Sequence, residues 1–225
     1  MPPKPKYTKE EIIDAAYLLV CERGADALTA REVGNRLGTS SSPIFTVFRD
    51  MEELKNAVRA RAKACFDRYM ETAEQFRPAY KKRGMQWVKF AQEQPMLFRL
   101  LFMEGMKSLP DFDHALQIIP FGKENDIAII QRDYHASAAQ AEHLFRQMWV
   151  YTYGLCALCA AQVCSFTEQE IAQQLGEIFR GMIFVLRQSA PDINALVPAQ
   201  RDTPAGAEIE AQNPDLRVQT GGNPT

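Results

Sequence analysis

The sequence predicts an all-α protein, and three observations predict that class. Thr8, Thr29, Asp50 and Thr167 each precede a glutamate by three residues, which is the spacing of a helix capping box. Apolar residues then recur three and four positions apart, as they do on one face of a helix. No stretch alternates apolar and polar residues persuasively in the manner of a half-buried strand.

The N-terminal part of the chain predicts four helices. Gly24 and Gly38 are natural stops for the first two, because helices commonly end at a glycine. Pro78 interrupts the fourth, since proline cannot continue a helix. The predicted spans, with their caps and stops, are 8–24, 29–38, about 40–48 and about 50–76.

The chain from residue 80 to about residue 190 is also predicted to be helical. Pro95 suits the first position of a helix, where its missing N–H would be unpaired in any case. Pro110, Pro120 and Gly122 predict a loop or short turns over the segment around them. The predicted helices cover residues 80–94, 95–106, about 123–134, about 137–164 and about 168–188.

The last segment differs in composition from everything before it. It is rich in Pro, Gly, Ala, Asn and Gln and contains no aromatic residue, so it cannot bury enough apolar surface to fold. We therefore expect three parts: a first domain over residues 1–50, a second helical domain over 51–190 and a disordered tail over 191–225.

Composition narrows the protein class. The chain is 46% hydrophobic and 24% charged, as is ordinary for a globular protein. No apolar run reaches the roughly 18 residues of a transmembrane helix. The N-terminus lacks the apolar core of a secretory signal, and an odd number of cysteines suits a reducing compartment. We expect a cytoplasmic protein without a membrane partner.

The net charge of −2 conceals an asymmetry along the chain. Residues 1–83 carry 16 Lys and Arg against 12 Asp and Glu, a net charge of +4. Residues 84–190 carry 8 against 11, a net charge of −3. A basic N-terminal part is weakly consistent with a surface that faces DNA.

Residues 29–48 have the layout of a DNA-binding helix-turn-helix, with Gly38 at the break. In that motif the start of the second helix enters the major groove, where hydroxyl groups reach phosphates or base edges. Pro43 is tolerated there if it falls in the first turn. The hydroxyl-bearing residues are Thr39, Ser40, Ser41 and Ser42. The pattern alone leaves open a polar loop before a short helix.

Residues 8–55 resemble the N-terminal DNA-binding domain of the tetracycline-repressor (TetR) family of bacterial regulators. The matching features include Leu28-Thr29 before the second helix, the run IFTVF at 44–48, and the sequence EEL at 52–54. The resemblance implies an N-terminal three-helix helix-turn-helix domain, followed by a helical ligand-binding and dimerisation domain. It also implies a double-stranded DNA operator, a small-molecule effector of unknown identity and a homodimer as partners.

The resemblance further implies which residues face DNA. Three positions depart from the family's pattern: Phe45 lacks a tyrosine hydroxyl, Val47 lacks an imidazole and Met51 lacks a lysine charge. Phosphate contacts must then depend on other cations, whereas Phe48 is expected in the core. The DNA-facing candidates, which combine these positions with the hydroxyl-bearing residues above, are Thr29, Arg31, Thr39, Ser40, Ser41, Ser42, Pro43, Phe45, Thr46, Arg49 and Lys55.

Aromatic residues and methionines gather in the second domain. They suit an adaptable apolar pocket, and a plain core explains each of them equally well. The candidate effector-binding residues are Trp87, Phe90, Phe98, Phe102, Met103, Met106, Trp149 and Tyr153. The resemblance implies that the helices at about 137–164 and 168–188 form the dimer, and small residues such as Gly154 in the first would allow close helix approach. We expect no cofactor.

Two alternative chemistries are weighed against this interpretation. Cys156 and Cys159 have the Cys-x-x-Cys spacing of some metal and redox sites, but on a helix they share one buried face, where cysteine is common. His114, His135 and His143 belong to no catalytic motif, so we expect neither a metal site nor an enzyme.

We therefore expect a homodimeric transcriptional regulator, in the form of a repressor that a small effector releases from its operator. The alternative is a helical ligand-binding or interaction module with a degenerate DNA-binding head. The departures at Phe45, Val47 and Met51 are the only features that favour it.

Overall fold

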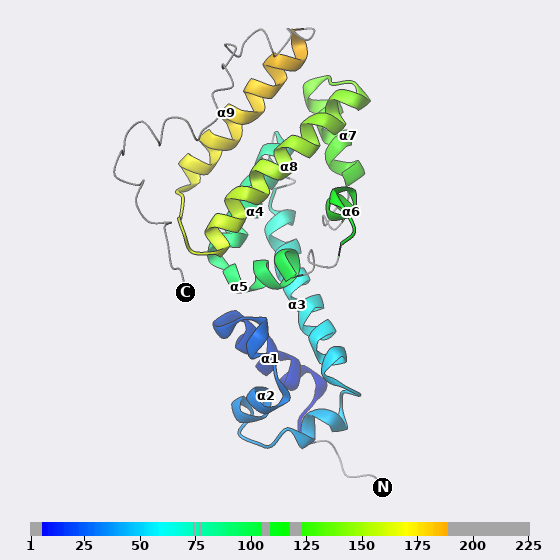
Figure 1. Ribbon diagram of the computed structural model, residues 1–225, viewed down its shortest axis with the longest axis vertical. Helices are drawn as coiled ribbons and strands as arrows, with labels where there is room; N and C mark the ends of the chain where they lie inside the picture. Colours follow the sequence, from blue (N-terminus) through cyan, green and yellow to red (C-terminus); the bar gives the residue numbers. More distant parts are fainter. Residues whose placement is uncertain (1–5, 74, 77, 105–108, 118–122, 189–225) are drawn as a thin grey trace, which may run out of the picture. The chain divides into compact units, whose positions relative to one another are not determined.

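A computed structural model describes residues 6–73, 75–76, 78–104, 109–117 and 123–188 (Figure 1). The elements in these ranges are all helices, which confirms the predicted all-α class. The chain divides into two units, 1–184 and 185–225, and only the last residues of the final helix belong to the described part of the second. Within the described ranges, no helix is both long and apolar enough to cross a bilayer.

The helices follow one another with short connections. In the described ranges, three shorter elements interrupt the α-helices: two 3-10 helices, η1 (Ala25–Ala27) and η2 (Ser42–Thr46), and a π-helical segment, η3 (Arg99–Glu104). The α-helices are α1 (Lys9–Arg23), α2 (Ala30–Arg36), α3 (Met51–Glu71), α4 (Ala79–Glu93), α5 (Pro95–Phe98), α6 (Phe112–Gln117), α7 (Lys123–Tyr134), α8 (Ala138–Ala160) and α9 (Glu168–Arg187).

Side-chain caps fix the helix starts as the sequence predicts. Thr8 and Glu11 form a complete capping box at α1, with the Thr8 N–H donating to the Glu11 carboxylate at 2.7 Å. Asp50 accepts from the Glu53 N–H at 2.8 Å at the start of α3. A complete capping box would have the Glu53 carboxylate accept from the Asp50 N–H, but it accepts from the Arg49 N–H at 2.9 Å instead.

Three predicted boundaries were wrong. α3 ends at Glu71 rather than near residue 76, because the Thr72 hydroxyl donates to a carbonyl of the last turn. α8 ends at Ala160 rather than near residue 164, since Gln162 adopts a left-handed φ of 58°. The segment predicted as loop or short turns contains the six-residue helix α6, whose first turn is stabilised where the Asp111 carboxylate accepts from the His114 N–H.

The head, which we define as residues 9–58, is built around a buried core that is mostly aliphatic and includes one phenylalanine. Its turn after α2 needs Gly34, because a Cβ there would lie 2.9 Å from the Ser40 carbonyl group. Gly38 in the same turn has a φ of 67°, which favours glycine. The buried side chains include Ile12, Ala16, Leu19, Val20, Leu28, Val33, Ile44, Phe48, Leu54 and Val58. The expectation that Phe48 lies in the core is confirmed.

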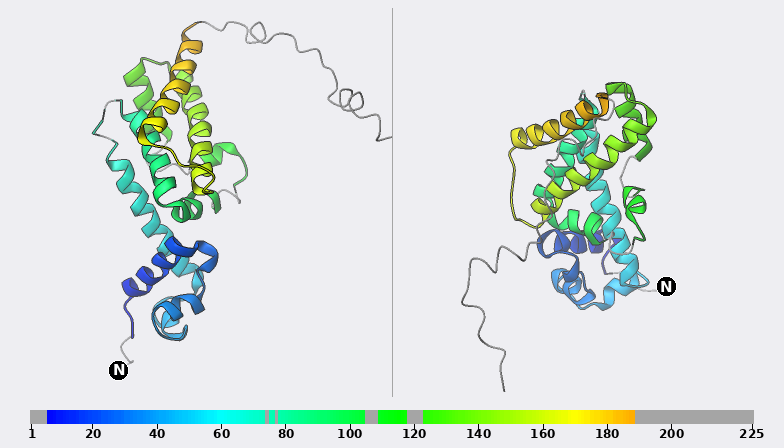
Figure 2. Two further views of the ribbon diagram at one scale, coloured as in Figure 1. Left: turned by 90° about the vertical axis from the view of Figure 1, so that its left-hand side faces the viewer. Right: turned by 45° about the horizontal axis from the view of Figure 1, so that its top comes forward.

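The body, which we define as residues 59–184, is a bundle in which α8 packs against α4 and α7 (Figure 1). α9 lies beside α4 and α8 (Figure 2). Gln92 of α4 holds the segment before α9 in place by hydrogen bonds. The Gln92 carboxamide accepts from the Phe166 N–H at 2.6 Å and donates to the Phe166 carbonyl at 3.1 Å. α3 belongs to both regions, and the division of the chain at residue 50 stays a prediction.

Candidate nucleic-acid interface and ligand cavity

The predicted DNA-facing residues lie in the turn after α2 and along η2. Ser42 and Phe45 are exposed and lie one 3-10 turn apart, so they share one outward side. Ile44 is fully buried and turns to the opposite side. The exposed candidates are Thr29, Arg31, Ser40, Ser42, Phe45, Thr46 and Arg49, and the half-buried ones are Thr39, Ser41, Pro43 and Lys55.

The recognition segment is shorter than predicted. The sequence predicts a helix over about 40–48, whereas the structure has a five-residue 3-10 helix from Ser42 to Thr46. Serine and proline are poor helix formers, and Pro43 supplies no N–H, which explains the short element. Pro43 stands in its first turn, as expected. The Thr46 hydroxyl donates to the Pro43 carbonyl at 2.7 Å and closes the turn.

Ion pairs neutralise some cations of the head and leave others exposed. Arg36 of α2 donates two hydrogen bonds to Glu22 of α1 at 2.6 and 2.7 Å, and this contact lowers the pKa of the Glu22 carboxyl. Arg31 forms no ion pair with any residue that the structure describes. The Arg49 side chain is 82% exposed and lies 3.5 Å from Asp50. Arg31 and Arg49 are therefore the cations of this surface most accessible to a phosphate.

Two further candidates are partly engaged within the chain. The Thr29 hydroxyl oxygen accepts from the Glu32 N–H at 3.2 Å as the cap of α2, yet its O–H remains able to donate to a phosphate. The ammonium group of Lys55 lies 3.9 Å from the Glu52 carboxylate. This distance is at the limit of an ion pair, so a phosphate can compete for the lysine.

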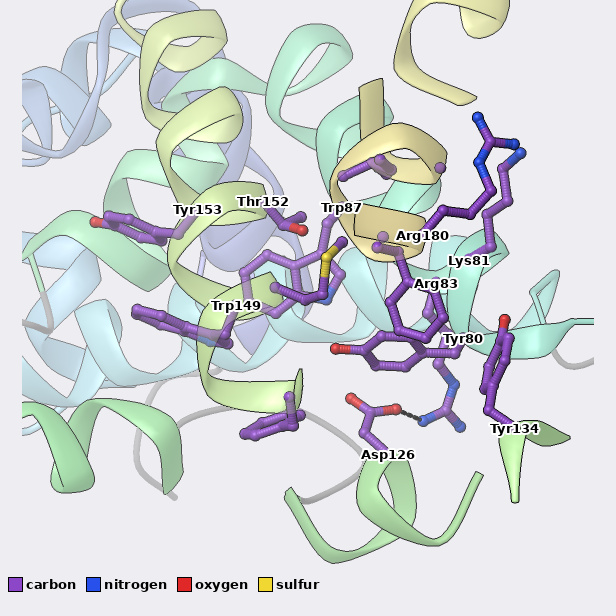
Figure 3. A pocket seen from close by; sticks show the side chains of 16 residues that line it. Tyr80, Lys81, Arg83, Trp87, Asp126, Tyr134, Trp149, Thr152, Tyr153 and Arg180 are labelled. Atoms are coloured by element: carbon purple, nitrogen blue, oxygen red, sulfur yellow. Dashed lines mark hydrogen bonds and ion pairs between the residues drawn. The ribbon is translucent and has the colours of Figure 1, made fainter. Parts of the chain in front are cut away.

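A cavity of about 190 Å³ lies in the body, enclosed by α4, α7, α8 and α9 (Figure 3). Its walls are largely aromatic and aliphatic. The lining residues are Tyr80, Lys81, Arg83, Gly84, Trp87, Asp126, Tyr134, Phe145, Met148, Trp149, Thr152, Tyr153, Leu175, Gly176, Phe179 and Arg180. A mostly apolar cavity with a few converging polar groups is the usual form of a small-molecule site.

A buried ion pair forms part of the cavity wall. Arg83 of α4 donates to the carboxylate of Asp126 of α7, and both side chains are almost completely buried. Burial raises the pKa of the Asp126 carboxyl, although the neighbouring guanidinium opposes the rise. Burial also raises the pKa of Tyr80 well above its usual value, and the Asp126 charge adds to this. The Tyr80 hydroxyl therefore stays protonated.

The sequence-predicted effector residues separate into two groups. Trp87, Trp149 and Tyr153 line the cavity. Phe90, Phe98 and Phe102 lie instead in the packed core, where the Phe66 ring of α3 contacts Phe90 and Phe102 at centroid distances of 5.1 and 5.0 Å. Met103 is half-buried on η3 and is not part of the cavity wall, and Met106 lies outside the described residues.

Sequence reasoning missed the charged members of the cavity. Arg83 stands on the apolar stripe of α4, four residues after Ala79 and four before Trp87. A cation in such a stripe could have indicated a buried ion pair, because a buried arginine needs a buried partner. Its partner, Asp126, is 43 residues away, and nothing local in the sequence connects the two.

The cysteines of α8 are poorly placed for redox chemistry. Burial raises the pKa of Cys156 well above its ordinary value and raises that of Cys159 to about 11. A thiol is nucleophilic only as its thiolate, so both are weak nucleophiles at neutral pH. In the described part of the chain, no cluster of His, Cys, Asp and Glu is arranged to hold a metal ion.

Comparisons with known proteins agree with this arrangement. Residues 12–58 match the model of the tetR family of bacterial regulatory proteins. A solved structure of a TetR-family member from Streptomyces coelicolor A3 is similar in fold, with a TM-score of 0.53 and 16% sequence identity. The similarity covers 78% of this chain and 98% of that one. No curated protein matches the chain.

The matched segment runs from α1 to the second turn of α3 and therefore contains the whole helix-turn-helix. The helical body that follows shares its fold with a complete TetR-family structure. Residues 12–58 are therefore a DNA-binding head of the tetR type, which supports a DNA-binding transcriptional regulator.

Proposed function

We propose that this protein is a homodimeric repressor that leaves its operator when a small effector enters the body cavity. The observation that carries the proposal is a contact between the cavity and the helix that supports the head. Trp87 lines the cavity, and its ring packs edge-on against Phe66 of α3 at a centroid distance of 5.2 Å. Phe66 is fully buried, so it cannot yield to a displaced tryptophan without moving α3.

α3 can transmit such a movement because it is anchored in both regions. Leu54 and Val58 are fully buried in the head, and Phe66 and Met70 are buried in the body. A rigid helix packed at both ends passes a displacement from one end to the other. An effector that moves Trp87 would therefore change the position of the recognition segment.

Exposed apolar residues on α8 and α9 support the dimer. Val150 and Leu158 of α8 are 52% and 45% exposed, and Phe184 of α9 is 62% exposed. Gly154 and Gly181 lie among them on the two helices, and the space where each would carry a Cβ is open. Glycines that the chain's own packing does not require, set among exposed apolar residues, suit close approach by helices of a second copy.

The two recognition segments of a dimer would meet successive major grooves, about 34 Å apart along the DNA. A repressor of this kind acts on the bacterial chromosome, so the proposal places the protein in the cytoplasm. In a reporter strain, deleting the gene for this protein should raise transcription from the operator-bearing promoter. A fall in transcription would instead identify an activator.

Operator binding is tested with fluorescently labelled DNA from upstream of the protein's own gene. Binding should weaken steeply with salt, because the cations displace counterions from phosphates. Arg31→Ala should weaken binding and lower the salt slope by about one, whereas Ser41→Ala should reduce the preference for the specific site. Arg68→Ala, which changes an exposed cation in the body part of α3, is the control.

Unchanged specific affinity in the Arg31→Ala, Ser41→Ala double variant would refute the proposed contact surface. No specific binding at any salt concentration would favour the degenerate head.

The dimer is tested with Phe184→Asp, measured by light scattering during size-exclusion chromatography. A charge in an apolar interface is costly, so the variant should be a monomer and should lose operator binding. Val163→Asp is the matched control, because Val163 is 70% exposed and follows the end of α8. A Phe184→Asp protein that still runs as the wild-type dimer would exclude this interface.

A further inference from the structure

We propose that the effector is a small aromatic carboxylate, with its ring between the aromatic walls of the cavity and its carboxylate at Lys81 and Arg180. This inference rests on the proposed function, because it names the chemistry of the ligand for the same cavity. It depends on the size of the cavity, the shape of its walls and the balance of its charges.

The size of the cavity sets the size of the ligand. A cavity of roughly 150 Å³ lined by apolar side chains is sufficient for benzene. The cavity here measures about 190 Å³. It therefore has room for one aromatic ring with a short substituent.

The walls of the cavity favour a flat apolar body. Phe179 of α9 lies between two tyrosine rings, with centroid distances of 5.8 Å to Tyr80 and 4.6 Å to Tyr134. On α8 the rings of Trp149 and Tyr153 are stacked, 5.1 Å apart and inclined by only 5°. An aromatic ligand can pack against such surfaces in edge-on or stacked geometry, which adds to the stabilisation from apolar burial.

The charges of the lining are unbalanced at one place. Of the lining residues, Lys81, Arg83 and Arg180 are cationic, and only Asp126 is anionic. Asp126 is already paired with Arg83 in the wall. Lys81 and Arg180, by contrast, form no ion pair with any residue in the described ranges. The cavity thus offers two positive charges that no residue in the described ranges neutralises.

These two cations belong to the same part of the cavity wall, where α4 meets α9. The Lys81 ammonium lies 3.6 Å from the position that a Cβ on Gly176 would occupy, so the lysine reaches from α4 across to α9. Arg180 is one helical turn beyond Gly176 and projects from the same side of α9. In Figure 3 both side chains lie on the side of the cavity away from Trp149 and Tyr153.

A carboxylate meets the needs of this arrangement better than other groups. A cationic ligand would be repelled by the two positive charges, and a neutral one would make no ion pair with either of them. A carboxylate can accept charge-assisted hydrogen bonds from both side chains, and these are about twice as strong as neutral hydrogen bonds. Binding would then link α4 to α9 and place the aromatic ring against Trp87, the residue that contacts α3.

The chain carries its own reporter for the test. It has two tryptophans, Trp87 and Trp149, and both line the cavity. Tryptophan fluorescence of the full-length protein is titrated with benzoate, phenylacetate and 3-phenylpropionate, and in parallel with the three corresponding amides. At least one carboxylate should bind about tenfold or more tighter than its amide, because the amide lacks the charge that the two cations meet.

Variants identify the residues responsible. Lys81→Gln and Arg180→Gln should each weaken binding of the carboxylate by about tenfold, and the double variant should bind acid and amide alike. Lys81→Arg, which keeps the charge, should retain binding. Lys89→Gln on the same helix is the control, because Lys89 is exposed and is not part of the cavity wall. Circular dichroism establishes that each variant is folded.

The inference is overturned if no carboxylate binds up to about 10 mM, if amides bind as tightly as acids, or if the double variant binds like the wild type. Failure of the proposed function is recognised separately, in the DNA-binding assay. If a carboxylate binds in the cavity without changing operator affinity, the release mechanism is wrong and the proposed ligand class stands. If a neutral amide releases the operator and the acid does not bind, the release mechanism stands and the proposed ligand class is wrong.

Discussion

The head and the body of this protein keep their functional residues in opposite places. In the head a continuous segment of chain fills its own core, and the groups available to DNA stand on the outside. In the body four helices enclose a cavity, and the charged and aromatic groups available to a ligand line its inside. Binding and stability are therefore separable in the head, where a surface group can change without affecting the core, whereas in the body they are coupled.

Phe48 and Phe45 provide the sharpest test of this separation and the largest expected effect. Phe48 is 1% exposed and Phe45 is 47% exposed, although they lie three residues apart. Phe48→Ala should lower the free energy of unfolding by about 3 to 5 kcal/mol, because it leaves a cavity in the head core. Urea denaturation, at one fixed protomer concentration because a dimer's stability depends on it, measures the change.

Phe45→Ala is the matched variant. It should cost less than about 1 kcal/mol of stability, as is usual for exposed positions, and it should weaken operator binding if the ring packs on DNA. Equal losses of stability in the two variants would show that the outward and inward sides of η2 have been assigned wrongly.

Ion pairs give the second comparison between head and body. Asp126→Asn breaks the buried pair with Arg83, and we expect it to cost about 3 kcal/mol because the guanidinium keeps its charge in a buried site. Glu22→Gln breaks the pair with Arg36 on the head surface, and it should cost much less stability, because exposed ion pairs contribute little. Thermal and urea unfolding of both variants measure the difference.

A third variant separates charge from volume in the body. Replacing both members of the pair, as Arg83→Met with Asp126→Leu, should recover most of the lost stability, because no unpaired charge remains. A double variant no more stable than Asp126→Asn would mean that the pair contributes through its specific geometry rather than through charge compensation.

The same contrast explains how far the sequence could predict the structure. The caps at Thr8 and Asp50 and the inward position of Phe48 are local features, set by residues three or four positions apart, and the structure confirms them. The predicted length of the recognition segment was wrong, because the serine and proline residues disfavour a long α-helix and the segment forms a short 3-10 helix instead.

The cavity could be predicted only in part. Trp87 and Phe90 are three residues apart on one helix and equally aromatic, yet the first lines the cavity and the second is buried in the core. Which of the two faces a ligand depends on where α8 and α9 pass, more than fifty residues further along the chain. Composition therefore indicates that apolar packing occurs in this region, but it does not locate an empty space within it.

The smallest expected effect concerns the junction of head and body, at the cap of α3. Asp50→Ala removes the acceptor for the Glu53 N–H and should destabilise the protein slightly at neutral pH, whereas Asp50→Asn keeps a cap and should destabilise it less. The pKa of Asp50 is lowered, first because its carboxylate accepts that N–H bond. A capping carboxylate should therefore differ from a capping amide in its dependence on pH.

The direction of that dependence follows from proton binding. A carboxyl group whose pKa is lower in the folded than in the unfolded protein stabilises the fold at every pH above its unfolded pKa, here 3.8. This contribution is lost as the pH falls through the folded pKa. The stability advantage of wild type over Asp50→Asn should thus be full at neutral pH and disappear in strong acid. The pKa of Glu53 is also lowered, but this residue is present in both proteins, so its effect cancels in the difference. If the difference in urea midpoint between the two proteins stays constant from neutral to acidic pH, the Asp50 charge does not stabilise the start of α3.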